Sequence, residues 1–163
     1  MDEKTVLQRI VERRHVKFVD SVDSWEEAVR LSCEPLVETG YTAPDYYKQI
    51  VDCVKKYGPY MVFDHYVAMP HTQENAVGAY KTAVGFMRVK NTVDFGTDED
   101  GEKKEAKLFF PLVAVNPEEH LENMQQLMEI FMNEPLLDAL MEADTPEDIL
   151  RAEAEHPPME DDF

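Results

Sequence analysis

Residues 108–115 form an almost continuous apolar run, Leu-Phe-Phe-Pro-Leu-Val-Ala-Val. A short unbroken run of this kind is typical of a strand that is buried on both faces, which requires other layers of structure on either side. Pro111 favours a bulge or an edge position instead, because proline cannot donate a hydrogen bond to a neighbouring strand. Helical and strand-like patterns alternate along the rest of the chain, which favours an α/β or α+β layer architecture.

The other elements follow from apolar spacing and from capping residues. Strand-like pieces are expected at 16–19, 60–63, 67–69 and 82–89, and the polar stretch 98–104 is expected to form a loop or hairpin tip. Helices are expected at 5–14, 24–40, 44–57 and 136–141, with two more beginning after Asn116 and Thr145. Two residues strengthen the helix start at Asn116. Pro117 suits the first helical position, and Glu119 follows three residues after the cap, as in a capping box.

The length of 163 residues suits one domain, which we expect to span residues 1–154, followed by an acidic, proline-containing mobile tail at 155–163. No apolar run is long enough to cross a bilayer, and the first residues do not resemble a signal peptide. These features predict a cytoplasmic protein without membrane insertion. Cys33 and Cys53 occupy apolar-face positions of separate expected helices, which favours buried, reduced thiols.

The formal net charge is −18, from 34 acidic and 16 basic residues. Such a chain repels nucleic acid and anionic membranes, so a direct role on either is not expected. The charge could steer a basic protein partner, or it could serve solubility alone.

The residue pattern around His71 carries the most chemical information. The strand-like piece Val67-Ala68-Met69 ends in Pro70-His71, and the proline fixes the backbone just before the imidazole. A neutral imidazole has a free nitrogen lone pair near neutral pH, so it can attack phosphorus and form a phosphoramidate. On the pattern alone, a histidine that is merely structural or incidental remains the more frequent outcome.

His120 lies in the first turn of the helix that begins after Asn116. Free backbone N–H groups and the helix dipole favour an anion there and disfavour imidazolium, so a neutral imidazole that donates a hydrogen bond is expected. Asp64 and His65 could instead join the two other histidines as zinc ligands, although the spacing matches no compact zinc motif. Lys55 could reach an anion or could simply cover the C-terminus of its helix.

Several blocks of the sequence together resemble the enzyme IIA domains of the bacterial sugar phosphotransferase system, in the mannitol/fructose superfamily and most closely its ascorbate type. The resemblance covers residues 5–152. It depends on the segments Trp25-Glu26-Glu27-Ala28-Val29, Tyr46-Tyr47, Gly58-Pro59-Tyr60, Val67-Ala68-Met69-Pro70-His71, Val113-Ala114-Val115 and Glu119-His120.

The resemblance implies a single α/β domain with a mixed, mainly parallel sheet of about five strands between layers of helices. His71 would be phosphorylated at Nε2 by the histidine-phosphorylated carrier HPr, and the group would pass to a cysteine of a cognate enzyme IIB. His120 would stabilise the phosphoryl group. The resemblance implies no metal or organic cofactor, and it leaves open a homodimer and the identity of the sugar.

The sequence departs from the family pattern in two places. The family often has glycine just before the strand and just after the histidine, whereas in this chain those neighbourhoods read Asp64-His65-Tyr66 and Thr72-Gln73. The mannitol branch carries an active-site arginine on the second helix, where this chain offers Lys55 as a replacement that acts as a point charge. A regulatory enzyme IIA-like protein, whose phosphorylation state controls a partner, is the alternative function. A metal-dependent hydrolase is a third.

Overall fold

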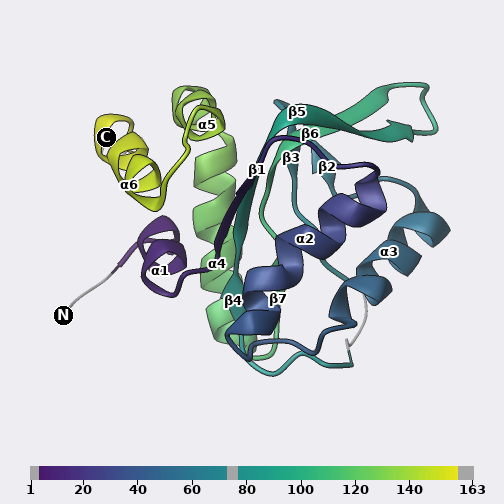
Figure 1. Ribbon diagram of the computed structural model, residues 1–163, viewed down its shortest axis with the longest axis horizontal. Coiled ribbons are helices and arrows are strands. Elements are labelled where there is room, and N and C mark those ends of the chain that lie inside the picture. The colour runs from purple at the N-terminus through teal and green to yellow at the C-terminus, as the bar shows by residue number, and fades with distance from the viewer. Residues whose placement is uncertain (1–3, 73–76, 158–163) are drawn as a thin grey trace.

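The computed structural model describes residues 4–72 and 77–157. Within these ranges a five-stranded sheet lies between two layers of helices (Figure 1). Its strands follow in the spatial order β1 (Val16–Val19), β5 (Phe86–Thr97), β6 (Lys103–Phe109), β3 (Val67–Ala68) and β2 (Val62–Phe63). The β1–β5 and β3–β6 pairs are parallel, whereas β5–β6 and β2–β3 are antiparallel. The expected mixed sheet of five strands is therefore confirmed, but within it the two parallel pairings are matched by two antiparallel ones, so the sheet is not mainly parallel as expected.

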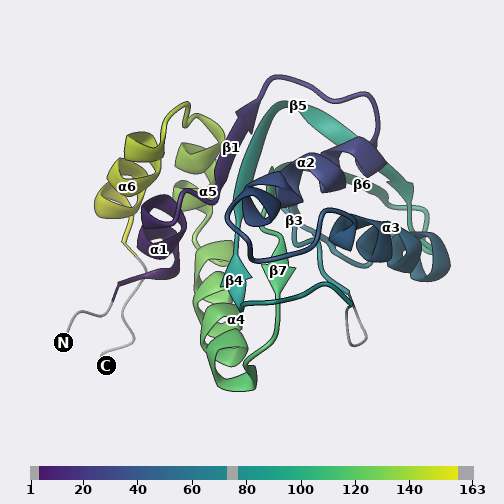
Figure 2. The same ribbon diagram turned by 60° about the horizontal axis from the view of Figure 1, so that its bottom comes forward.

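The helices divide between the two faces of the sheet (Figures 1 and 2). Helices α2 (Trp25–Glu38) and α3 (Tyr46–Tyr57) cover one face, and α1 (Val6–Glu12), α4 (Pro117–Phe131), α5 (Glu134–Met141) and α6 (Pro146–Glu155) cover the other. Because side chains alternate along a strand, β5 supplies Met87 and Val89 to one core and Phe86 to the opposite core. The sheet is thus buried on both faces at its centre, as the apolar run at 108–115 predicts.

Two of the expected strands are each interrupted by a short break. The run 82–89 is interrupted at Gly85, and the run 108–115 is interrupted at Phe110 and Pro111. The Gly85 N–H donates to the Pro111 carbonyl at 2.9 Å, and a Cβ atom added at Gly85 would lie 3.0 Å from Pro111 Cγ. Beyond this close approach the two segments pair again as a separate two-stranded antiparallel sheet, β4 (Ala83–Val84) with β7 (Leu112–Val113).

Strand β5 continues through residues 90–97, where the sequence analysis expects no strand. Here Val93 and Phe95 are buried while their neighbours are exposed, so one face of the β5–β6 ribbon meets solvent. The expected hairpin tip is confirmed: Asp98 Oδ1 accepts hydrogen bonds from the N–H groups of Asp100 and Glu102, both at 2.9 Å.

The ends of the helices follow the capping residues closely. The Asn116 side chain accepts from the Glu119 N–H at 3.0 Å, and Pro117 is the first residue of α4. Helix α6 ends at Glu155, so the expected domain boundary at residue 154 falls within its last turn. Residues 158–163 of the expected tail lie outside the described residues. None of the helices in the described part of the chain has both the length and the apolar character needed to cross a membrane.

Candidate functional site

His71 lies at the end of a firmly bonded strand. Strand β3 pairs in parallel with β6, and backbone hydrogen bonds continue beyond the end of β3. The Met69 N–H donates to the Met61 carbonyl at 2.9 Å, and the Leu112 N–H donates to the Pro70 carbonyl at 2.9 Å. The side chains at 67–70 are all buried, whereas His71 is half-buried. The imidazole is therefore the first partly accessible group after a fixed stretch of backbone.

A hydrogen bond to the main chain fixes the tautomer of His71. Its Nδ1 lies 2.5 Å from the carbonyl oxygen of Met69. A carbonyl oxygen can only accept, so Nδ1 carries the hydrogen and the neutral ring has its lone pair on Nε2. Nε2 is thus the nitrogen that can act as a nucleophile or a ligand.

The same edge of the fold brings His120 close to His71. Because Leu112 is bonded to Pro70, strand β7 delivers the start of α4 to the end of the His71 strand. The Thr82 hydroxyl anchors this connection by accepting from the N–H groups of Val115, at 2.9 Å, and Asn116, at 2.6 Å. His120 then follows in the first turns of α4, near enough for its charge to affect the His71 ring.

Burial keeps both imidazoles neutral. It lowers the pKa of His71; the hydrogen bond to Met69 raises that pKa in part, and the positive charge that His120 carries when protonated lowers it further. Burial also lowers the pKa of His120. At neutral pH the site therefore offers a free lone pair on His71 and a second neutral ring that can donate one hydrogen bond.

The start of α4 provides fewer free backbone donors than the sequence predicts. The His120 N–H donates to the Asn116 carbonyl at 3.0 Å, and the Glu119 N–H is taken by the Asn116 side chain. Pro117 has no N–H at all. The expectation of free donors is thus wrong for these positions, so the contribution of His120 to an anion has to come from its side chain.

Tyr60 is a neighbour of His71 that sequence reasoning did not select. Its hydroxyl donates a hydrogen bond to the His71 carbonyl oxygen, and the two rings meet edge to face with centroids 5.2 Å apart. The only sequence signal was the Gly58-Pro59-Tyr60 block, which contributed to the family resemblance without a role assigned to the tyrosine.

Lys55 lies in the last turn of α3 and is exposed. No contact between Lys55 and either histidine occurs in the part of the chain that the structure describes. Its role as a binding residue in place of the family's arginine stays a prediction. In its observed position the ammonium group complements the C-terminal end of the helix dipole.

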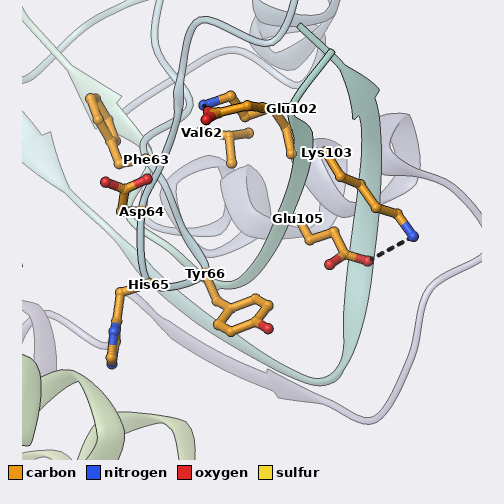
Figure 3. A pocket seen from close by; sticks show the side chains of 9 residues that line it. Val62, Phe63, Asp64, His65, Tyr66, Glu102, Lys103 and Glu105 are labelled. Carbon is orange, nitrogen blue, oxygen red and sulfur yellow. Dashed lines mark ion pairs between the residues drawn. The ribbon is translucent and has the colours of Figure 1, made fainter. Parts of the chain in front are cut away.

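His65 and Asp64 belong to a different part of the surface, the turn between β2 and β3. The His65 Nε2 lies 2.7 Å from Asp138 Oδ1 of α5, so its ring faces that helix. The turn borders a hollow of about 510 Å³ that also includes Lys103 and Glu105 of β6; Figure 3 shows the His65 side chain directed away from these two residues. Within residues 4–72 and 77–157, no three His, Cys, Asp or Glu side chains are grouped as metal ligands. The zinc alternative therefore gains no support from the geometry.

The two cysteines are free thiols, as expected. Cys33 is buried, and burial raises the pKa of its thiol to about 12, so it is inert. Cys53 of α3 is only half-buried, so the expectation of a buried thiol is wrong for this residue.

Comparison with known proteins identifies the class. Residues 9–154 match the family model described as phosphoenolpyruvate-dependent sugar phosphotransferase system, EIIA 2. The chain is 27% identical over 142 residues to the ascorbate-specific PTS system EIIA component of Escherichia coli K12, covering 86% of this chain and 90% of that protein. It therefore belongs to the EIIA 2 family of the sugar phosphotransferase system.

Solved structures agree with this membership. The crystal structure of the mannitol IIA from Escherichia coli matches with a TM-score of 0.68 at 27% identity, covering 85% of this chain and 96% of that one. The Escherichia coli complex of IIA mannitol with phosphorylated IIB mannitol contains a chain that matches with a TM-score of 0.67 at 25% identity, covering 86% and 94%. Membership in this family supports a role as a phosphocarrier component in sugar transport, with transferase character.

Proposed function

We propose that this protein accepts a phosphoryl group from phosphorylated HPr on Nε2 of His71 and passes it to a cysteine of a cognate enzyme IIB. The hydrogen bond from Nδ1 of His71 to the Met69 carbonyl carries this proposal, because it leaves the Nε2 lone pair available on a half-buried, neutral ring. The names of the curated relatives make ascorbate the first sugar system to test.

Each transfer is a displacement at phosphorus. In the first, the His71 Nε2 lone pair attacks, a new N–P bond forms, and the N–P bond to the donor histidine breaks with its electron pair returning to the donor ring. The hydrogen stays on Nδ1 throughout, hydrogen-bonded to the Met69 carbonyl oxygen, so the phosphorylated ring carries a positive charge that this carbonyl stabilises. In the second, a cysteine thiolate of the acceptor attacks and an S–P bond forms, while the N–P bond to His71 breaks with its electron pair returning to Nε2, so the neutral ring is restored.

His120 would serve as the neutral donor to the phosphoryl oxygens. Its lowered pKa keeps it uncharged, and a donor directed at the developing charge accelerates transfer without taking up the group itself. The net charge of −18 favours encounter with a basic donor protein. The complex of a related IIA with phosphorylated IIB supports enzyme IIB as the acceptor. These proteins would meet in the cytoplasm.

The test is incorporation of phosphate from purified, phosphorylated HPr. We expect His71→Ala to abolish incorporation and His65→Ala, a matched change on the β2–β3 turn, to leave it unchanged, because His65 contacts α5 rather than His71. Full incorporation in His71→Ala would overturn the proposal.

A further inference from the structure

Tyr60 makes two independent contacts with His71. Its hydroxyl donates to the main-chain oxygen of His71, and its ring lies edge to face against the imidazole, with an interplanar angle of 88°. The ring contact restricts rotation of the imidazole, while the hydrogen bond restricts the backbone that carries it.

The backbone needs this support because the strand bonding ends just before it. In the part of the chain that the structure describes, the last strand-like bond on this segment joins the Leu112 N–H to the Pro70 carbonyl. The Met69 carbonyl orients Nδ1 from within the same segment, so it cannot fix the segment relative to the rest of the fold. Tyr60 ties His71 to the end of α3 instead.

Tyr60 itself is well fixed. Gly58 ends α3 with φ of +85°, a conformation that side chains rarely adopt, and this turn lets the chain reverse so that Tyr60 reaches the site. The Tyr60 ring meets that of Tyr57 edge to face, with the ring centroids 6.5 Å apart. Burial raises the pKa of Tyr60, which keeps it a neutral donor.

We infer that Tyr60 is a positioning residue for phosphoryl transfer: it directs the Nε2 lone pair of His71 by holding the His71 carbonyl and the edge of the ring. This inference depends on the proposed function, in which His71 is the phosphorylated residue. Tyr60 acts through His71 and takes no part in the bonds that form and break.

The experiment compares Tyr60→Phe, which removes only the hydroxyl, with Tyr60→Leu, which also removes the ring contact. Tyr66→Phe is the matched control, since Tyr66 is an exposed tyrosine at the opposite end of β3. Phosphotransfer from phosphorylated HPr gives kcat and KM, and the ¹⁵N spectrum of the unphosphorylated protein reports the tautomer of His71. Amide spectra establish that each variant is folded.

We expect Tyr60→Phe to lower kcat about tenfold with KM unchanged, as for loss of one hydrogen bond, and to shift the His71 ring ¹⁵N signals towards a mixture of tautomers. Tyr60→Leu should lower kcat about threefold further. Wild-type kcat and an unchanged ¹⁵N spectrum in both variants would overturn the inference while leaving His71 as the acceptor. Failure of wild-type protein to take up phosphate on His71 would instead overturn the proposed function.

Discussion

Nδ1 of His71 lies 2.5 Å from the carbonyl oxygen of Met69, two residues earlier in the same chain segment. The interaction is local, and the residue between the two partners is a buried proline, Pro70. Because proline fixes the backbone angle φ, the carbonyl and the ring are set in register before the segment packs. A short sequence thus encodes the tautomer of the candidate nucleophile.

The acidity of His71 predicts how transfer depends on pH. Burial and the His120 charge place the folded pKa below 6.5, and the reactive form is the neutral ring. The single-turnover rate should therefore be constant above about pH 6.5 and fall as the pH drops through the folded pKa. Rapid-quench measurement from pH 5 to 8 tests this. His120→Gln removes the neighbouring charge and should move the midpoint upward; a wild-type midpoint above 6.5 would contradict the assignment.

His120 should matter for rate and not for folding. Its side chain is half-buried and the bonds that start α4 come from Asn116, so His120→Ala should retain the fold. Loss of one positioned donor to the phosphoryl oxygens predicts a rate about 10²-fold lower. His156→Ala, at the end of α6, is the control. An unaltered rate in His120→Ala would remove this residue from the site.

Thr82 links the stability of the fold to the site. Its buried hydroxyl is the shared acceptor for two N–H groups at the entrance to α4. Thr82→Val should cost about 1–3 kcal/mol of unfolding free energy, because both donors lose a partner, and it should also slow transfer by loosening His120. Urea unfolding measures the first effect and the HPr assay the second. Thr92→Val, on the exposed side of β5, should change neither the unfolding free energy nor the transfer rate. Equal effects of the two substitutions would show that the Thr82 hydroxyl does not anchor the start of α4.

His15 should make the protein sensitive to acid. The sequence analysis assigns it no role, yet it is fully buried, its Nε2 lies 2.9 Å from Thr39 Oγ1, and burial lowers its pKa to about 4, with Arg13 adding to the effect. Between pH 6.5 and 4 the unfolded chain binds a proton that the folded chain excludes, so stability falls as the pH falls. The full effect is about 3 kcal/mol.

The measurement is urea unfolding at several pH values, in wild type and in His15→Leu. The variant lacks the titrating ring, so its stability should depend less on pH in this window. A wild type and a variant with parallel pH profiles would show that His15 stays unprotonated in both states or titrates equally in both.

Local patterns account for most of the fold. Asn116, Thr145 and Pro117 mark helix starts because caps act within one turn, and the structure agrees. The ribbon at 90–97 escaped prediction because a strand with one solvated face carries few apolar residues. The change of sheet at Gly85 and Pro111 depends on their contact across 26 residues of chain, which no local pattern contains.

The residues of the candidate site, too, were found partly from local sequence patterns, whereas their contacts depend on the tertiary structure. His71 and its proline could be found locally, and His120 could be found as a residue of a helix start. Their proximity arises from the bond between Pro70 and Leu112, a tertiary contact, so the sequence predicted it only through the family resemblance. Tyr60 was missed because its bond to His71 joins two residues that lie 11 positions apart, on either side of β2 and β3, and no local pattern contains that contact.

The most direct test of the account is to locate the phosphorus atom itself. Protein labelled with ¹⁵N-histidine, phosphorylated by HPr and observed by ³¹P and ¹⁵N NMR, should show phosphorus coupled to Nε2 of His71 and a hydrogen retained on Nδ1. Phosphorus on Nδ1 of His71, or on any nitrogen of His120, would contradict it.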